Sequence, residues 1–181
     1  MKLWLVRHAQ PLLESGVCYG ALDIAADRQA THAAALCLAQ VLPLAVELIS
    51  STLQRCEQVT QCLCGLRPDL ICNFDKRLVE MNFGQWEGQR WDDIARAQLD
   101  GWTSDFANWH RGGAECVAEF MARVGAVWDE TKASNQPTVW ITHAGVIRAA
   151  NCIAQGRRQM GQASKWPVAA PAWGQWQALE L

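Results

Sequence analysis

Two apolar segments that each end in a histidine stand out in the hydrophobic pattern of this chain. Residues 3–8 read Leu-Trp-Leu-Val-Arg-His, and residues 139–143 read Val-Trp-Ile-Thr-His. Apolar runs of this length and composition predict buried strands. In an open α/β sheet the carboxyl ends of parallel strands meet at one crevice. We therefore expect His8 and His143, far apart in the sequence, to face the same ligand.

The remaining apolar segments predict alternating helices and strands. Helical spacing predicts helices over residues 27–42, 51–64, 91–99, 114–132 and 145–155. Short apolar runs predict further strands over residues 47–50 and 70–73, near Trp166 and near Trp176. Strands that alternate with helices of this length are typical of an α/β sandwich with a mostly parallel sheet.

Polar and glycine residues mark the ends of these segments. Asp27 or Thr31 is expected to cap the first helix, and Ser51 and Thr52 the second. Residues 101–113 contain glycines at their two ends and predict a loop or lid.

Composition and charge narrow the possible classes of protein. A chain of 181 residues, half of them apolar, fits one compact domain, which we expect to cover residues 1–181. The 16 basic and 18 acidic residues give a net charge of −2, which favours neither nucleic acid nor an anionic membrane surface as a partner. Any anion site must therefore be local.

Cysteine usage and the apolar runs bear on location. The eight cysteines are scattered, and none forms a Cys-x-x-Cys pair, so we interpret them as small buried thiols in a reducing compartment. The longest apolar stretch, residues 33–50, contains Gln40, Pro43 and Glu47 and is not expected to span a bilayer. The first strand pattern leaves no room for the apolar core of a signal peptide. These features together predict a cytoplasmic protein.

The pair Arg7 and His8 suggests phosphate chemistry. A neutral imidazole is a good nucleophile toward phosphorus, and a guanidinium presents a donor fork that fits phosphate oxygens. An isolated Arg-His pair is more often a histidine bound to backbone beside a solvated arginine, so the other segments must carry the argument. Arg55 adds a second cation one turn into a helix that follows a strand, where free N–H groups favour an anion. Glu80 adds a carboxylate ahead of a glycine-punctuated turn.

Four segments in this order carry a resemblance to a known family. They are Arg-His-Ala at 7–9, Ser-Thr-Leu-Gln-Arg at 51–55, Leu-Val-Glu-Met-Asn-Phe-Gly-Gln-Trp-Glu-Gly at 78–88 and His-Ala-Gly at 143–145. The set resembles the motifs of the histidine phosphatase superfamily, which includes cofactor-dependent phosphoglycerate mutases and many small phosphomonoesterases. The resemblance spans residues 3–148 and implies a three-layer α/β sandwich, with helices flanking a mostly parallel mixed sheet.

The resemblance also implies a role for each matching residue. His8 would be the nucleophile that becomes phosphohistidine, and Arg7, Arg55 and His143 would bind the phosphoryl oxygens. Glu80 would protonate the leaving oxygen and later accept a proton from water. The positive charges should lower the pKa of His8 and keep it neutral. No metal or cofactor is expected, and the partner is a small phosphorylated metabolite acted on by a monomer or homodimer.

The chain departs from the family pattern after the nucleophile. The family usually has glycine, threonine and asparagine where this chain has Ala9, Pro11 and Glu14. Pro11 has neither a hydroxyl nor a backbone N–H, so one expected phosphate contact is missing. This loss leaves open a phospholigand-binding domain without turnover.

The predicted lid carries a cluster of aromatic residues, among them Trp102, Phe106 and Trp109. This composition favours a substrate with an organic group that stacks, although the same rings can simply cover the core. A lid with little basic character argues against phosphoglycerate mutase, which remains the alternative. The loop 18–23 with Tyr19, and the short chain, most resemble α-ribazole phosphatases of cobalamin biosynthesis. We expect Tyr19 and Trp109 to bind substrate, and we interpret Arg148 as a cation on a helix face.

Overall fold

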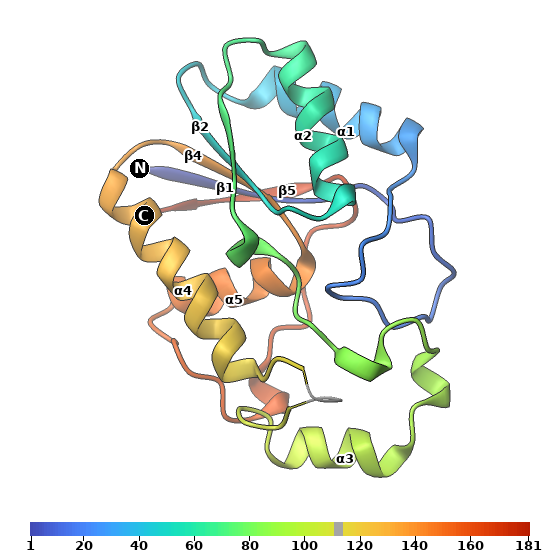
Figure 1. Cartoon of the computed structure of the whole chain (residues 1–181). Coiled ribbons are helices and arrows are strands. Elements are labelled where there is room, and N and C mark those ends of the chain that lie inside the picture. The colour runs from blue at the N-terminus through green and yellow to red at the C-terminus, as the bar shows by residue number, and fades with distance from the viewer. Residues whose placement is uncertain (111–113) are drawn as a thin grey trace.

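A five-stranded sheet forms the centre of the computed structural model, which describes residues 1–110 and 114–181 (Figure 1). The strands are β1 Lys2–Arg7, β2 Glu47–Ser50, β3 Cys72–Phe74, β4 Thr138–Thr142 and β5 Trp176–Glu180. Their order across the sheet is β3-β2-β4-β1-β5. The first four strands run parallel, and β5 is antiparallel to β1, so the mostly parallel mixed sheet is confirmed.

Helices cover both faces of this sheet, which confirms the three-layer arrangement. They are α1 Arg28–Val41, α2 Gln54–Leu66, α3 Arg96–Ser104, α4 Val117–Ser134 and α5 Ala144–Ala154. In Figure 1, α1 and α2 lie above the sheet, α4 and α5 lie below it, and α3 lies apart at the lower end. Short 3₁₀ helices occur at Lys76–Leu78, Gly84–Trp86, Trp91–Asp93 and Ala163–Lys165.

Successive side chains of the central strands pack into two separate hydrophobic cores, one on each face of the sheet. In β4, Trp140 joins the cluster of α4 and α5, whereas Val139 and Ile141 join the cluster of α1 and α2. In β1, Leu5 and Val6 divide in the same way. This is the alternation expected of strands whose successive side chains point to opposite faces. All five residues of β4 are buried, and its three central residues, 139–141, form an unbroken apolar run.

In the second half of the chain one predicted strand is wrong and one predicted loop is right only in part. No strand forms at Trp166, which directly follows the 3₁₀ helix Ala163–Lys165, whereas the strand predicted near Trp176 is present as β5 beside β1. The predicted loop at 101–113 begins inside α3, which runs to Ser104. Gly101 within this helix leaves room for the ring of Trp109, which lies 2.8 Å from where a Cβ would be. The remainder of the predicted lid includes residues 111–113, which lie outside the described residues.

The helix ends predicted from the sequence are confirmed only in part. Asp27 caps α1 by accepting a hydrogen bond from the Ala30 N–H at 2.8 Å, as predicted. The α2 helix begins at Gln54 after Leu53, which gives no side-chain cap, so the predicted cap by Ser51 and Thr52 is wrong. The predicted helix at 91–99 forms only from residue 96 onward. Across the described ranges, no helix has the length and apolar character needed to cross a bilayer.

Candidate active site

The pairing of β1 with β4 brings two histidines together. Arg7 lies opposite Thr142 in the parallel register, so the next residues, His8 and His143, leave the sheet side by side. The backbone N–H of His8 donates to the Thr142 carbonyl at 3.0 Å. The two ring centroids are 5.2 Å apart, and the exposed fractions are 2% for His8 and 0% for His143. The convergence expected from the strand pattern is therefore present.

The position of the proton on His8 follows from one backbone contact. Its Nδ1 lies 2.7 Å from the carbonyl oxygen of Ala9. A carbonyl only accepts hydrogen bonds, so Nδ1 carries the proton and Nε2 carries the free lone pair. Burial, and then the charge of Arg55, lower the pKa of His8 to about 3, with a smaller contribution from Arg7 and an opposing one from the Ala9 contact. His8 is therefore a neutral imidazole with an available Nε2.

The second histidine is held by two side chains. Arg55 donates from Nε to Nδ1 of His143 at 3.2 Å, so the proton of this ring is on Nε2. That Nε2 lies 2.8 Å from the hydroxyl oxygen of Ser51. Burial, followed by the charge of Arg55, lowers the pKa of His143 well below its ordinary value. Both ring nitrogens of His143 therefore have protein partners, and the ring is fixed in one orientation and one tautomer.

Arg55 is a fully buried cation in the first turn of α2. Its Nη1 donates to the Leu22 carbonyl at 2.8 Å and its Nη2 to the Gly20 carbonyl at 2.6 Å. The guanidinium lies 5.3 Å from the ring centre of Tyr19. Each terminal nitrogen carries a second hydrogen, which can be donated to an oxyanion. The loop that the sequence connected with substrate therefore packs directly on a cation beside both histidines.

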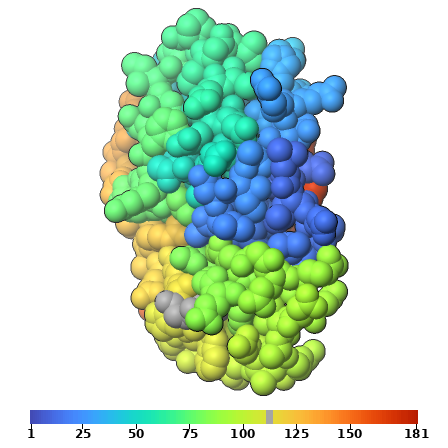
Figure 2. Space-filling model, turned by 45° about the vertical axis from the view of Figure 1, so that its right-hand side comes forward, coloured from blue at the N-terminus to red at the C-terminus, as the bar shows by residue number. Residues whose placement is uncertain are grey.

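This loop also closes over the neighbouring segment. A Cβ at Gly20 would lie 1.9 Å from the Met81 carbonyl oxygen, so only glycine fits there. Val17 forms a bridge with Arg90, and the Cys18 N–H donates to the Gln89 carbonyl at 2.7 Å. Figure 2 shows the resulting surface, where the blue N-terminal loop lies against the green segment that leads to α3.

Glu80 reaches the histidines through the start of α5. Its Oε2 accepts the Gly145 N–H at 2.8 Å, and its Oε1 accepts the Met81 N–H at 3.0 Å. A Cβ at residue 145 would lie 2.1 Å from Oε1, so the glycine two residues after His143 permits this approach. The backbone carbonyl of Glu80 accepts a hydrogen bond from Arg123 at 3.2 Å. The carboxylate is half-buried and held at a defined place.

Arg7 has one hydrogen-bond donor, its Nε, that is available to a ligand. Its Nη1 donates to the Pro171 carbonyl at 3.0 Å, and its guanidinium lies 5.3 Å from the ring centre of Trp173. Its Nε is buried without a hydrogen-bond partner among the described residues. A buried donor without a partner is unfavourable, and an oxyanion at this place would satisfy it.

The predicted substrate-binding residues lie in different surroundings. Tyr19 packs on Arg55, whereas Trp109 is 39% exposed and packs over Gly101 in α3. The roles assigned to both stay predictions.

Sequence reasoning missed two residues of the site. Ser51 was assigned to a helix cap, although it follows β2, whose parallel neighbour ends just before His143. Cys56, one residue after Arg55, places its Sγ 3.5 Å from Nε2 of His143, and burial raises its pKa to about 12. Its position in the first turn of α2, next to Arg55, is the signal that was available.

Arg148, interpreted as a cation on a helix face, lies in α5 and lines a pocket together with Glu80 and Gly145. It is half-buried, and burial lowers its pKa. Its role stays a prediction.

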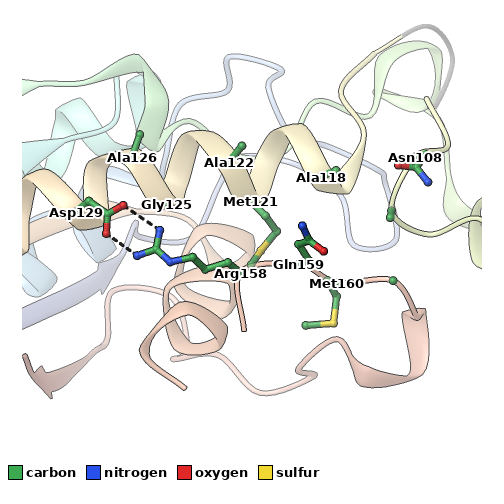
Figure 3. Close-up of a pocket in the computed structure, with 12 residues that line it drawn as sticks. Asn108, Ala118, Met121, Ala122, Gly125, Ala126, Asp129, Arg158, Gln159 and Met160 are labelled. Atoms are coloured by element: carbon green, nitrogen blue, oxygen red, sulfur yellow. Dashed lines mark hydrogen bonds and ion pairs between the residues drawn. The ribbon is translucent and has the colours of Figure 1, made fainter. Parts of the chain in front are cut away.

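A larger hollow of about 680 Å³ lies between α4 and residues 158–161 (Figure 3). Small residues of α4 form one wall, and Arg158 crosses it to bind Asp129, with an Nη1–Oδ2 distance of 2.9 Å. None of the predicted site residues lines this hollow.

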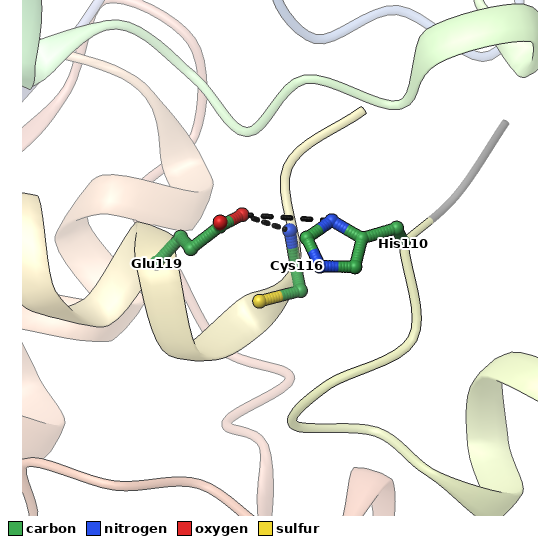
Figure 4. A group of neighbouring side chains, drawn as sticks. All are labelled: His110, Cys116 and Glu119. Carbon is green, nitrogen blue, oxygen red and sulfur yellow. Dashed lines mark hydrogen bonds and ion pairs between the residues drawn. The ribbon is translucent and has the colours of Figure 1, made fainter. Parts of the chain in front are cut away.

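One group of three metal-ligating side chains occurs within residues 1–110 and 114–181 (Figure 4). The ligand atoms of His110, Cys116 and Glu119 lie within 4.8 Å of one another. Glu119 accepts the Cys116 N–H at 3.0 Å, and Nδ1 of His110 lies 2.8 Å from the Ala114 carbonyl. These contacts are those of a capped helix start, and none of the three is a predicted site residue.

The sequence of most of the chain is similar to that of known proteins. A model of the histidine phosphatase superfamily (branch 1) matches residues 3–173. A protein of Hydrogenobacter thermophilus, named "Putative phosphoserine phosphatase 2", is 28% identical over 172 residues, which are 92% of this chain and 83% of that protein.

Several solved structures are also similar to this chain. A mycobacterial glucosyl-3-phosphoglycerate phosphatase in complex with inorganic phosphate is 26% identical, with a TM-score of 0.80 over 99% of this chain and 89% of that one. An Escherichia coli K-12 structure described as a "putative alpha-ribazole-5'-P phosphatase" is 20% identical, with a TM-score of 0.83 over 98% of this chain and 89% of that one. At this identity the second likeness concerns the fold alone.

Proposed function

The chain belongs to the histidine phosphatase superfamily (branch 1), and on this basis we propose that it is a phosphomonoesterase that needs no metal and works through a phosphohistidine on His8. The observation that carries the proposal is the state of His8. It is a buried, neutral imidazole with its proton on Nδ1, its Nε2 lone pair free, and two arginines close enough to lower its pKa.

The proposed reaction has two steps. In the first, Nε2 of His8 attacks phosphorus, the N–P bond forms, the ester O–P bond breaks, and Glu80 gives its proton to the leaving oxygen. In the second, Glu80 takes a proton from water, the hydroxide oxygen attacks phosphorus, the N–P bond breaks with its electron pair returning to Nε2, and inorganic phosphate leaves. His8 is then neutral again and Glu80 protonated, so the cycle closes without a further reactant.

Charge stabilisation comes from the groups around the phosphoryl oxygens. The unpaired Nε of Arg7 and the remaining hydrogens of Arg55 supply donors, and His143 forms the wall opposite His8 at 5.2 Å. Enzymes accelerate phosphate-monoester hydrolysis by up to ~10²¹-fold, mostly through positioning and charge stabilisation. The similar solved structure that holds inorganic phosphate supports a phosphate site in this fold.

The substitution of glycine by Ala9 fits the proposal. Ala9 is buried, and its carbonyl is the group that orients His8, so the added methyl is accommodated beside the nucleophile. Pro11 forms a bridge with Ala26 and contributes no donor. A domain that binds phosphate without turnover is the alternative that this loss favours.

Hydrolysis of p-nitrophenyl phosphate with and without EDTA tests the reaction. We expect phosphate release that is unchanged by the chelator, and a phosphorylated protein that survives an alkaline quench but not an acid one. Release that disappears with EDTA contradicts the metal-independent mechanism. Phosphate binding without any release indicates the non-catalytic alternative.

We propose α-ribazole 5′-phosphate as the first substrate to examine. The loop that carries this resemblance, residues 18–23, contacts Arg55 through Tyr19, Gly20 and Leu22 and so belongs to the site. A panel that also contains phosphoserine, glucosyl-3-phosphoglycerate and 3-phosphoglycerate covers the substrates named for the relatives. Conversion of 3-phosphoglycerate to its isomer, in place of phosphate release, would identify a mutase.

A further inference from the structure

Two hollows flank Glu80, and they differ in chemistry. One, of about 360 Å³, is lined by Lys76, Arg77 and Arg123 among other polar residues. The other, of about 230 Å³, has Glu80, Gly145 and Arg148 at its polar side and is otherwise lined by apolar side chains. In the proposed reaction Glu80 protonates the leaving oxygen, so these two hollows are places next to its carboxylate that can take the rest of the leaving group.

Five aromatic rings line the smaller hollow, which we call the aromatic pocket; they are Phe83, Trp91, Trp102, Phe106 and Trp166. Successive rings touch one another, mostly edge to face, with centroid distances of 5.4–6.4 Å. Trp102 and Phe106 are stacked, at 5.4 Å and an angle of 28°. Such contacts fix the rings against one another, so the walls of the pocket are already formed.

Three separate segments build these walls. Phe83 and Trp91 come from the stretch after Glu80, Trp102 and Phe106 from α3 and its end, and Trp166 from the stretch after α5. A core that only needed covering could be filled completely by these large side chains. Here they leave a hollow that is also lined by Glu80.

Arg148 gives the aromatic pocket one cationic wall. Its Nη2 donates to the Val168 carbonyl at 2.8 Å, but its Nε is buried and has no hydrogen-bond partner among the described residues. It is the one charged residue of α5, a helix that is otherwise almost entirely buried. A ligand that enters this pocket and carries a hydrogen-bond acceptor would satisfy that donor.

In the other hollow, both arginines are already paired. Arg77 is bound to Asp75 and Glu130, with Nη2–carboxylate distances of 2.7 and 2.6 Å. Arg123 is bound to Glu115 at 2.5 Å and to backbone carbonyls. These two arginines therefore stabilise the segment that carries Glu80, and the cation left for an incoming group is Lys76, an exposed side chain.

We propose that the aromatic pocket binds the leaving group, and that it selects a planar aromatic or heteroaromatic ring with a hydrogen-bond acceptor on the edge that faces Arg148. The inference rests on the proposed phosphatase reaction and adds the substrate class. A ring stacks between the aromatic walls, while Arg148 discriminates among rings by their acceptors.

Two phosphates with the same reacting group test the ring preference. Benzyl phosphate and butyl phosphate both release a primary alcohol, so they differ mainly in whether a ring enters the pocket. We expect kcat/KM for benzyl phosphate to be at least about tenfold higher in the wild-type protein. Equal values would overturn the proposal.

Arg148→Met tests the acceptor preference. We expect benzyl phosphates with a ring carboxylate or amide, at the meta or para position, to surpass benzyl phosphate in the wild type and to lose that advantage in the variant. Arg158→Met, at the hollow of Figure 3, is the matched control and should leave the ratio unchanged. No effect of Arg148→Met, or a loss of the preference in Lys76→Met instead, would overturn the assignment to this pocket.

Binding to the His8→Ala variant separates this inference from the proposed reaction. Calorimetry should give tighter binding of benzyl than of butyl phosphate without turnover. If the wild type hydrolyses neither compound and this preference persists, the proposed reaction fails and the pocket stands. If both are hydrolysed and bound equally well, the pocket assignment fails and the reaction stands.

Discussion

The two regions that flank Glu80 differ in the interactions that hold them together. On the side of His8 and His143, buried polar groups are held by directed hydrogen bonds at the ends of strands and the start of a helix. On the side of Trp102 and Arg148, large rings pack on one another from three connecting segments. The strand register places the first side, whereas the second depends on how three connecting segments pack against the core below the sheet. We infer that the reaction resides in the first side and substrate choice in the second.

Removing the nucleophile should have the largest effect and act on the histidine side alone. We expect His8→Ala to lower kcat for p-nitrophenyl phosphate at least about 10³-fold, because no other group replaces Nε2 in forming the covalent intermediate. His32→Ala, at an exposed position of α1, is the control. Substantial residual turnover in the variant would refute covalent catalysis by His8.

Changing the group between the two sides should have an effect that depends on the substrate. Glu80→Gln keeps an acceptor for the Gly145 N–H but has no proton to give. We expect a loss of about 10²- to 10⁴-fold in kcat for benzyl phosphate and a much smaller loss for p-nitrophenyl phosphate, whose leaving group needs no proton. Initial rates with both substrates check this. Equal losses would remove Glu80 from the acid role.

The pH dependence of stability should also separate the two sides. Burial lowers the pKa of His8 to about 3 in the folded protein, so below pH ~6.5 the unfolded chain binds a proton that the folded one lacks. The contribution of His8 to stability is therefore complete above pH ~6.5 and declines as the pH falls toward 3. Between pH ~7 and ~5 it should decrease by about 2 kcal/mol.

Urea unfolding of wild-type protein and His8→Asn at these two pH values measures that change. The variant should lose about 2 kcal/mol less stability on acidification, because Asn does not titrate. His32→Asn should behave like the wild type. Parallel pH curves for His8→Asn and the wild type would show that His8 is not buried in the neutral state.

The smallest expected effect concerns the orientation of His143. Ser51→Ala removes the hydroxyl 2.8 Å from its Nε2, and we expect kcat/KM to fall about tenfold, the value of one buried hydrogen bond. Ser50→Ala is a matched control, because that buried hydroxyl contacts Thr60 and the Ser51 carbonyl but not the histidine. If both variants lose stability and activity alike, Ser51 has a structural role only.

Much of the histidine side could be predicted from the sequence. The strands that end at His8 and His143 are continuous apolar runs, and parallel strands must deliver their ends to one edge. Ser51 was missed because a serine ahead of a helix is also the commonest kind of cap, and only the β2–β4 register shows that its hydroxyl is used elsewhere.

The aromatic side could not be predicted to the same extent. The rings were visible in the sequence, but whether they fill the core or line a pocket depends on how three distant segments meet. The strand predicted at Trp166 was wrong because a large apolar residue between turns gives the same local pattern as a short strand. Arg148 did carry a signal, since a single charge within the mostly apolar helix α5 indicates a partly enclosed ionic group.

The contact between the Ala9 carbonyl and His8 determines which phosphohistidine isomer can form in the proposed reaction. Imidazole can form two phosphoramidate regioisomers, which differ in their ³¹P resonances and in their lability. With Nδ1 engaged by the backbone, only the τ isomer can form, and a main-chain oxygen thus sets the regiochemistry before any ester arrives.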